Sequence, residues 1–331
     1  MKILIMAGGY ATRLWPITKD NPKALLPVGN RAILDYILEK VGELDMEVYI
    51  STNRFFEAHF RPYAEKRGIK LIVEDTLHES EKLGTIGAMK RAVEELGLDD
   101  YLVIAGDNLF SFSLREFLEA YDGKTLIAVY DVGDMELAKR YGVVVLEGDK
   151  VLSFQEKPAE PRSTLVSTGV YVFPRRVMER IDEYLSNGNR DSPGYFLQWL
   201  LERKESIKAY RFSDYWYDIG SADSYLEALK TLLKESHVEE IQISPYAKII
   251  PPVVIKRGAK ILGRSMIGPY AYIGEECVIE NSDVSDSIIF RNTIIKNSTI
   301  WRSIIDEKCE IRNLELRKSL VGGHAKIQRG E

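Results

Sequence analysis

Apolar runs and amphipathic stretches alternate along the chain from residue 1 to about residue 235. Short apolar runs between turn residues are typical of buried strands, and apolar residues spaced three or four apart are typical of helices. The predicted strands are residues 2–7, 47–52, 69–73, 101–105, 125–131, 142–146 and 166–173. The predicted helices are residues 32–44, 54–67, 84–97 and 113–121. This alternation predicts an α/β domain whose mostly parallel sheet is covered on both faces.

A different pattern begins near residue 240, where isoleucine recurs every six residues. The series is Ile249, Ile255, Ile261, Ile267, Ile273 and Ile279. Two positions before each isoleucine lies a small or β-branched residue: Ala247, Val253, Ala259, Ser265, Ala271 and Cys277. A three-sided coil produces a period of six, because each short strand carries one inward aliphatic residue. Isoleucines continue to about residue 311, so we predict a left-handed parallel β-helix of four to five coils.

The change of pattern predicts two domains, an α/β domain over residues 1–236 and a β-helix domain over residues 237–331. An amphipathic helix over residues 221–236, capped by a serine or an aspartate at its start, is predicted to bridge them. Each coil buries its aliphatic residue only against neighbouring coils, which leaves the ends and flat faces of the stack available. We therefore expect a homo-oligomer that assembles through the β-helix.

A glycine turn, Gly8-Gly9, follows the first predicted strand. Two glycines at the carboxyl end of a strand let the backbone approach a ligand and turn its N–H groups toward an anion. Arg13 then supplies a forked cation suited to phosphate, and Lys23 supplies a point charge. This combination predicts a triphosphate site, the alternative being an ordinary turn with surface cations. Prolines follow at positions 16, 22 and 27, and no Gly-Lys-Ser/Thr closes a Walker-type loop.

Asp107 directly follows another continuous apolar run, residues 101–105. Ligands of parallel α/β sheets bind beyond the carboxyl ends of the strands. We therefore expect Asp107 to lie at the same sheet edge as the glycine turn, although an aspartate that merely forms a turn is the alternative. Convergence of two distant segments on one edge favours a binding site.

Composition excludes several classes of function. The 331 residues include 45 basic and 50 acidic side chains, and the net charge of −5 does not favour nucleic acid or an anionic membrane. No apolar run approaches the length of a membrane span, and the N-terminus shows no signal-peptide pattern. The two cysteines, Cys277 and Cys309, have no metal-binding spacing and are expected to be buried free thiols. These features predict a cytoplasmic protein.

The glycine turn belongs to a longer motif, Gly8-Gly9-x-x-Thr12-Arg13-Leu14 followed by Pro22-Lys23. Further motifs follow in order: Leu83-Gly84-Thr85-x-Gly87-Ala88, Gly106-Asp107-Asn108, Tyr141-Gly142, Glu156-Lys157-Pro158, Thr168-Gly169-Val170-Tyr171 and Trp216-Tyr217-Asp218-Ile219-Gly220. Together they resemble the sugar-1-phosphate nucleotidylyltransferases, in particular glucose-1-phosphate thymidylyltransferase-like members with a C-terminal hexapeptide-repeat β-helix. The resemblance implies a Rossmann-like sheet of the nucleotide-diphospho-sugar transferase type.

The resemblance also implies roles for individual residues. The catalytic cations would be Arg13, Lys23 and Lys157, and the magnesium ligands would be Asp107 and Asp218. The nucleotide would bind to Gly8, Gly9, Thr12, Leu83, Gly84 and Thr85. The sugar would bind to Gly142, Glu156, Thr168 and Gly169. Two carboxylates suit Mg²⁺, which keeps waters and takes substrate phosphates as ligands. A carboxylate also suits sugar hydroxyls, because it only accepts hydrogen bonds. Taken alone, the Glu-Lys-Pro and Leu-Gly-Thr segments and the second aspartate could each be ordinary turns or helix starts.

The implied reaction joins a sugar 1-phosphate to a nucleoside triphosphate and releases pyrophosphate. The attacking phosphate monoester is already anionic at pH 7, so cations and positioning are needed instead of a general base. All four histidines lie outside the motifs. We expect glucose 1-phosphate with dTTP or UTP, and the alternative pair is mannose 1-phosphate with GTP. The residues also leave open a non-catalytic nucleotide-sugar-binding regulator and a bifunctional enzyme with an acyltransferase in the β-helix.

Overall fold

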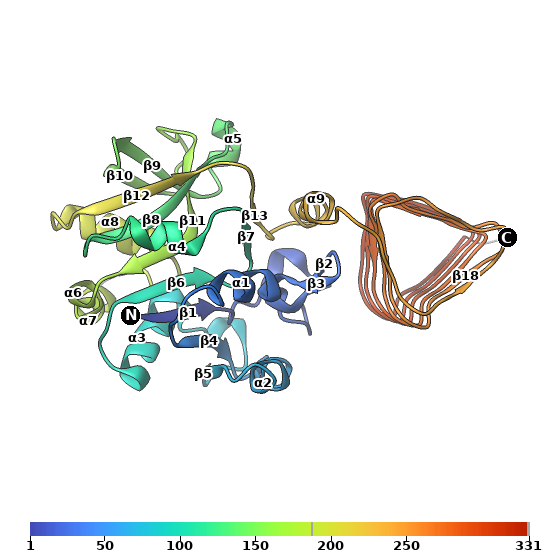
Figure 1. Cartoon of the computed structure of the whole chain (residues 1–331), viewed down its shortest axis with the longest axis horizontal. Helices are drawn as coiled ribbons and strands as arrows, with labels where there is room; N and C mark the ends of the chain where they lie inside the picture. Colours follow the sequence, from blue (N-terminus) through green and yellow to red (C-terminus); the bar gives the residue numbers. More distant parts are fainter. Residues whose placement is uncertain (187, 330–331) are drawn as a thin grey trace. The chain divides into compact units, whose positions relative to one another are not determined.

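The computed structural model describes residues 1–186 and 188–329 (Figure 1). These residues pack into two compact units. The first unit combines Met1–Gly9 with Leu34–Asp218, and the second combines Tyr10–Ile33 with Ile219–Glu331. The segment that contains Arg13 and Lys23 therefore packs with the C-terminal third of the chain. The predicted boundary at residue 236 stays a prediction.

The first unit contains a nine-stranded sheet in the order β5-β4-β1-β6-β11-β8-β12-β10-β9. Its strands are β1 (Lys2–Met6), β4 (Val48–Asn53), β5 (Lys70–Glu74), β6 (Tyr101–Ala105), β8 (Thr125–Asp131), β9 (Gly142–Glu147), β10 (Lys150–Glu156), β11 (Leu165–Phe173) and β12 (Ile207–Phe212). Strands β5, β4, β1 and β6 are all parallel. Beyond them the directions are mixed, because β11 pairs antiparallel with both β6 and β8. The predicted parallel arrangement is thus confirmed for these four strands, β5, β4, β1 and β6.

Eight helices of the described residues accompany this sheet. They are α1 (Ile33–Val41), α2 (Glu57–Glu65), α3 (Gly84–Leu96), α4 (Leu114–Glu119), α5 (Met135–Ala138), α6 (Arg175–Met178), α7 (Ile181–Leu185) and α8 (Pro193–Glu202). Side chains from strands and helices share one buried core, which includes Leu4, Val103, Met89, Phe173 and Phe196. Burial of each such side chain stabilises the fold by about 1.5–3 kcal/mol. This packing explains why the predicted strands are continuous apolar runs instead of alternating ones.

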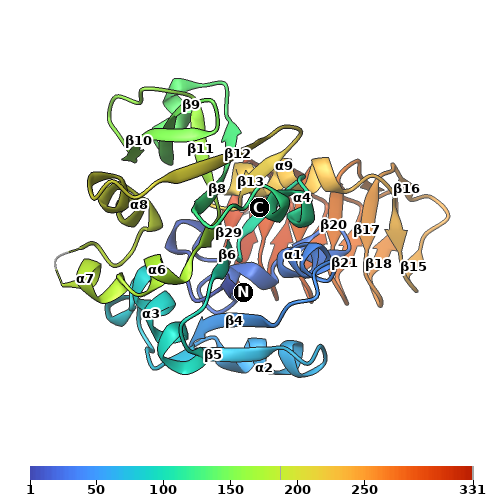
Figure 2. The same ribbon diagram turned by 60° about the vertical axis from the view of Figure 1, so that its left-hand side comes forward.

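The second unit contains the β-helix, which is three-sided when viewed along its axis in Figure 1 and shows its stacked strands in Figure 2. Its first sheet contains β14 (His237–Val238), β17 (Val253–Ile255), β20 (Ala271–Ile273), β23 (Ser287–Ile289), β26 (Ile304–Ile305) and β29 (Leu320–Val321). The second contains β15 (Gln242–Ile243), β18 (Lys260–Leu262), β21 (Val278–Glu280), β24 (Ile294–Lys296), β27 (Glu310–Arg312) and β30 (Lys326–Gln328). The third contains β16 (Lys248–Ile249), β19 (Met266–Ile267), β22 (Asp283–Ser285), β25 (Thr299–Trp301) and β28 (Glu315–Arg317). The prediction that the coils end near residue 311 is wrong, since the strands continue to Gln328.

The coil length changes along the β-helix. Val254 pairs with Tyr272, eighteen residues later, whereas Tyr272 pairs with Ile288, sixteen residues later. In the shorter coils the corners have positive φ at residues that tolerate a left-handed backbone, such as Asn281, Asn297 and Asn313. The loss of two residues per coil explains why the isoleucine spacing drifts after residue 279. Cys277 is fully buried in the β-helix core, as predicted, and burial raises the pKa of its thiol to about 12.

Helix α9 (Ala222–Leu232) also belongs to the second unit and ends earlier than predicted. Ser221 caps it in a reciprocal box with Ser224, so two N-terminal backbone donors are satisfied. The short strands β2 (Pro27–Val28) and β3 (Arg31–Ala32) form a hairpin in the same unit. The phenol of Tyr225 on α9 donates a hydrogen bond to the carbonyl of Pro27. The segment that contains Arg13 and Lys23 is thus anchored to α9.

Candidate active site

The carboxyl ends of the parallel strands bring several predicted site residues to one edge of the first unit. Gly8 follows β1, and Asp107 follows β6, the neighbouring strand. The backbone N–H of Gly106 donates to the carbonyl of Met6 at 2.8 Å, which joins the two strand ends directly. Segments almost a hundred residues apart in the sequence therefore lie side by side, as the parallel topology requires.

Residues at the ends of β4 and β5 contact the glycine turn. The buried side chain of Asn53 donates from Nδ2 to the carbonyl of Gly8 at 2.8 Å, and its Oδ1 accepts from the backbone N–H of Phe56. A Cβ atom on Gly8 would lie 3.4 Å from the backbone nitrogen of Asn53 and from Oε1 of Glu74, whereas one on Gly9 would meet no atom within 4 Å. Gly8 is thus closely packed against the protein, and Gly9 faces open space.

Glu74 is a member of this site that the sequence motifs do not include. It ends β5, pairs in register with Asn53 and is only 6% exposed. Burial raises the pKa of its carboxyl to about 7, and a hydrogen bond from the backbone N–H of Leu83 opposes the increase. The signal that could have found it is the one that identified Asp107, a carboxylate at the end of a continuous apolar run.

Leu83 precedes α3, Gly84 and Thr85 begin the helix, and the segment 189–191 supports them. Gly84 has φ of +74°, and a Cβ atom there would lie 2.4 Å from the carbonyl oxygen of Arg190. The backbone N–H of Ile86 donates to the same carbonyl at 3.0 Å. Glycine is therefore required at position 84 by both its backbone conformation and its close contact.

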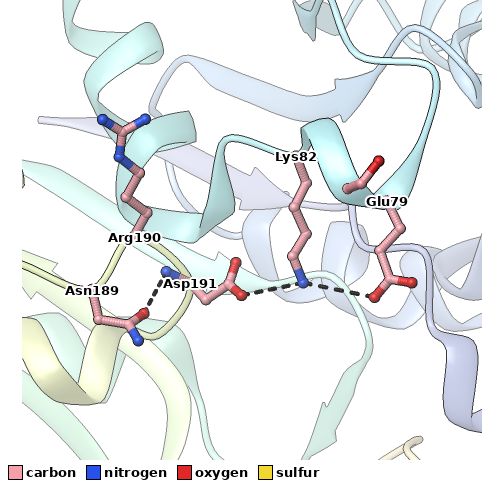
Figure 3. Close-up of a pocket in the computed structure, with 6 residues that line it drawn as sticks. Glu79, Lys82, Asn189, Arg190 and Asp191 are labelled. Carbon is pink, nitrogen blue, oxygen red and sulfur yellow. Dashed lines mark hydrogen bonds and ion pairs between the residues drawn. The ribbon is translucent and has the colours of Figure 1, made fainter.

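A pocket of about 580 Å³ lies beside this segment (Figure 3). Its lining residues are Glu79, Ser80, Lys82, Asn189, Arg190 and Asp191. The ammonium group of Lys82 lies 3.2 Å from a carboxylate oxygen of Asp191 and 3.8 Å from one of Glu79. These ion pairs connect the residues that precede Leu83 to the loop that supports Gly84.

The two predicted magnesium ligands are brought together by a two-stranded ribbon formed by β7 (Asn108–Phe110) and β13 (Trp216–Asp218). Asp218 is directly opposite Asn108, the neighbour of Asp107. The side chain of Asn108 contacts both sides of this ribbon. Its Oδ1 accepts a hydrogen bond from the indole of Trp216 on β13 at 2.7 Å, and its Nδ2 donates to Oδ1 of the preceding residue, Asp107, at 2.8 Å. The two aspartates thus belong to one local structure although 111 positions separate them in the sequence.

Within the described residues, no cluster of three or more His, Cys, Asp or Glu side chains could hold a metal ion. A pair of carboxylates still fits Mg²⁺, which binds through one or two carboxylates and completes its octahedron with waters and substrate phosphates. The donor set therefore suits magnesium better than Zn²⁺, which takes three or four ligands from the protein, mostly nitrogen and sulfur.

The predicted sugar-binding residues come from β9, β10 and β11. Glu156 ends β10 opposite Gly142 at the start of β9. Its buried carboxylate lies 3.4 Å from the half-exposed ammonium group of Lys157, whose φ is +45°. Lys157 thus turns the chain in a left-handed conformation directly after Glu156.

Thr168 and Gly169 lie where β11 changes its register against β8. The hydroxyl of Thr168 is buried and donates to the carbonyl of Ala128 at 3.1 Å. Gly169 has φ of +80°, and a Cβ atom there would lie 2.9 Å from Cβ of Ala105 and 3.4 Å from Nδ2 of Asn108. Gly169 thus packs against the same sheet edge as Asp107.

Thr12, Arg13 and Lys23 belong to the second unit. Thr12–Leu14 and Lys23–Leu25 each form one turn of 3₁₀ helix, and Ala11 before the first turn has φ of +49°. The hydroxyl of Thr18 donates to the carbonyl of Ala11 at 2.8 Å and so fixes this turn. Arg13 is exposed there, which leaves its guanidinium accessible to an anion.

Comparisons with known proteins agree with this architecture. Residues 2–235 match the family model described as "Nucleotidyl transferase", and residues 249–330 match the one described as "GMPPB C-terminal domain". The first match spans well over half of the chain, so the chain belongs to the nucleotidyl transferase family. Its relatives place it among the sugar-1-phosphate nucleotidylyltransferases.

Three relatives show the range of this family. The chain is 28% identical over 318 residues to glucose-1-phosphate thymidylyltransferase of Streptomyces griseus, with 88% of this chain and 87% of that protein covered. It is 31% identical over 316 residues to the bifunctional protein GlmU of Methanocaldococcus jannaschii, with 88% and 74% covered. It is 27% identical over 285 residues to the mannose-1-phosphate guanylyltransferase catalytic subunit beta of Drosophila pseudoobscura pseudoobscura, with 84% and 72% covered.

In the described part of this chain, every helix is too short or too polar to cross a membrane.

Proposed function

We propose that this protein transfers a nucleotidyl group from a nucleoside triphosphate to a sugar 1-phosphate in a magnesium-dependent reaction. The register of β7 and β13 supports the proposal most directly, because it pairs Asp218 with Asn108, the neighbour of Asp107. The same sheet edge carries the glycine turn after β1. An edge that combines a backbone turn suited to phosphates with two carboxylates suits a metal–triphosphate substrate.

Asp107 and Asp218 would hold the Mg²⁺ ion. The ion, when bound, neutralises phosphate charge and so lets two anionic substrates approach each other. The open space at Gly9 leaves room for triphosphate oxygens against its backbone N–H.

Cations of the chain would stabilise the charge that develops on the phosphates. Arg13 suits the leaving pyrophosphate, because its planar guanidinium can donate two parallel hydrogen bonds. Lys23 and Lys157 would hold the triphosphate and the sugar phosphate. Glu156 would accept hydrogen bonds from sugar hydroxyls, and its burial strengthens the selection of hydroxyls that reach it. The attacking phosphate oxygen carries its own negative charge and needs no proton removed.

Three substrate pairs are consistent with the relatives. Glucose 1-phosphate with dTTP or UTP follows from the sequence motifs and matches the name of the Streptomyces relative. Mannose 1-phosphate with GTP matches the name of the Drosophila relative. A purely regulatory, non-catalytic role is less well supported, since Arg13, Lys23, Asp107, Lys157 and Asp218 are all retained.

A substrate grid tests this proposal. Glucose, mannose, galactose and N-acetylglucosamine 1-phosphates are each combined with GTP, dTTP, UTP, ATP and CTP in the presence of Mg²⁺, and pyrophosphate release is measured. We expect at least one pair to react and D107N and D218N to abolish that reaction. D45N changes an exposed aspartate and serves as the matched control. Absence of pyrophosphate with every pair would contradict the proposal.

A further inference from the structure

The first sheet of the β-helix has an apolar outer surface. Four residues form a column along it, in register from strand to strand: Val254, Tyr272, Ile288 and Ile304. Their neighbours within each strand, such as Ile289, belong to the inner core. Because successive side chains of a strand point to opposite faces, the column points outward. Its members are nevertheless buried, each no more than 8% exposed, so other segments of the chain cover this surface.

Helix α9 is held by ion pairs to the corners that precede two strands of this sheet. The guanidinium of Arg302, before β26, lies 2.9 Å from a carboxylate oxygen of Glu227 on α9. A carboxylate oxygen of Asp286, before β23, lies 2.8 Å from the ammonium group of Lys230 on α9. Helix α9 in turn holds the carbonyl of Pro27. It therefore links the β-helix to the segment that carries two of the predicted cations.

The same segment also contacts the β-helix directly, at an early coil and at the last coil. The ammonium group of Lys256, directly after β17, donates to Oδ1 of Asn30 at 2.8 Å. Gly322, directly after β29, lies against the ring of Pro16. A Cβ atom at Gly322 would lie 2.7 Å from Cγ and 2.9 Å from Cβ of Pro16, closer than such atoms approach in proteins. The position of Pro16 therefore depends on a glycine in the last coil.

Pro16 lies three residues after Arg13, and tight turns connect the two. The backbone N–H of Ile17 donates to the carbonyl of Leu14 at 3.0 Å, and both of these side chains are buried. The ring of Pro16 fixes its own φ, which makes the connection stiffer. A displacement of Pro16 should therefore displace Arg13 as well.

We propose that the β-helix sets the position of Arg13 for the reaction, with Gly322 as a positioning residue that receives Pro16. The inference rests on the proposed function, in which Arg13 acts on the leaving pyrophosphate. The β-helix is then a platform for the phosphate-binding segment. A β-helix that served assembly alone would tolerate a change at this contact.

The variant G322A tests the contact. Its Cβ atom would force Pro16 to move by about 1 Å to restore an ordinary separation, and a misplacement of that size can lower turnover about 100-fold. We expect kcat to fall by at least about tenfold. KM for the sugar 1-phosphate should stay unchanged, because Glu156 and Lys157 belong to the first unit. An unchanged kcat would overturn the proposal.

G274A is the matched control within the β-helix. Its Cβ atom would lie 2.6 Å from the backbone nitrogen of Arg291, so the substitution strains one coil against the next. It should lower the melting temperature and leave kcat of the folded protein unchanged. Equal losses of kcat in G274A and G322A would show that general strain in the β-helix lowers activity, and would overturn the proposal.

A double-mutant cycle with P16G isolates the contact itself. P16G removes both atoms that the new Cβ atom would meet, so adding G322A to P16G should change kcat by less than about twofold. A full additional loss in the P16G background would overturn the proposal.

Calorimetric titration with Mg²⁺ and inorganic pyrophosphate gives the same comparison without turnover. G322A should bind pyrophosphate at least about tenfold more weakly than the unmodified protein, and G274A should bind it equally well. Equal affinity of G322A and the unmodified protein would overturn the proposal. Absence of turnover in the unmodified protein would instead contradict the proposed function.

Discussion

The phenolic oxygen of Tyr225 lies 2.6 Å from the carbonyl oxygen of Pro27, to which it donates a hydrogen bond across 198 residues of sequence. Tyr225 is fully buried on α9, and burial raises the pKa of its phenol well above 10, so the hydroxyl keeps its proton and donates at neutral pH. Pro27 ends the segment that carries Arg13 and Lys23. Helix α9 thus anchors the end of the segment that carries two of the three predicted catalytic cations.

Removal of this hydroxyl tests the importance of the anchor. Y225F leaves the carbonyl of Pro27 without its partner, which costs about 1–3 kcal/mol of stability. Because the anchored segment carries Arg13 and Lys23, which are proposed to bind phosphate, we also expect a lower kcat with little change in secondary structure. Chemical denaturation and steady-state kinetics measure the two effects. The anchor would be unimportant if both the free energy of unfolding and kcat matched those of the unmodified protein.

Lys23 is predicted to contribute to the transition state and not to folding. K23A should therefore lower turnover by about two to three orders of magnitude, a size typical of lost electrostatic stabilisation, while the melting temperature stays within a few degrees. K19A, which removes an exposed lysine four residues away, is the control. Near-normal turnover of K23A would remove Lys23 from the mechanism.

Two glycines with positive φ allow a matched test of the segment before α3. A Cβ atom at Gly84 would collide with the carbonyl of Arg190, whereas one at Gly97, with φ of +85°, would meet no atom within 4 Å. G97A should cost about 1–3 kcal/mol from backbone strain alone, because Gly97 has φ of +85° and ψ of 166°, a conformation that essentially only glycine adopts. G84A should cost more and should also raise KM for the nucleotide, because the supporting segment must shift. Equal losses of stability and unchanged KM would contradict the close contact at Gly84.

The raised pKa of Glu74 makes a prediction about stability against pH. Its pKa is about 7 in the folded protein against 4.5 for an unperturbed glutamate. The folded state therefore holds the proton more tightly than the unfolded state. The stability that this proton binding contributes is fully present below pH 4.5, and it is lost as the pH rises through about 7. E74Q removes this loss and should gain stability relative to the unmodified protein by up to about 3 kcal/mol as the pH rises from about 4.5 to about 8.

Denaturation of E74Q and of the unmodified protein at several pH values measures this difference. D75N, which changes an exposed carboxylate, should show no comparable trend. A stability difference for E74Q that does not depend on pH would mean that Glu74 is ionised in the folded state with its ordinary pKa.

Much of the fold could be predicted from local patterns. Buried parallel strands such as β1 and β6 are continuous apolar runs, and the six-residue isoleucine period has few structural solutions. The length of the β-helix could not be predicted in the same way. The early coils have eighteen residues and the later coils have sixteen, so no single fixed period extends to Gln328.

The candidate site shows a similar division. Motifs with unusual residues, such as Gly8 and Asp107, could be recognised in the sequence, and parallel topology then predicted their shared edge. Glu74 carries the same sequence signal as Asp107, an acidic residue at the end of an apolar strand, but such residues are common and only the structure shows that this one is buried. The anchoring of Pro27 by Tyr225 also depends on long-range packing, which no local pattern of residues contains.

The central claim is that this protein makes a nucleotide sugar by attack on the α-phosphorus of a nucleoside triphosphate. The most direct measurement incubates the protein with Mg²⁺, a sugar 1-phosphate and α-³²P-labelled GTP, dTTP or UTP, and follows the label and pyrophosphate together. The account predicts that the label appears in a nucleotide sugar, with one pyrophosphate released per molecule formed. Label that remains in the triphosphate, or that appears only in free nucleotide, would contradict it.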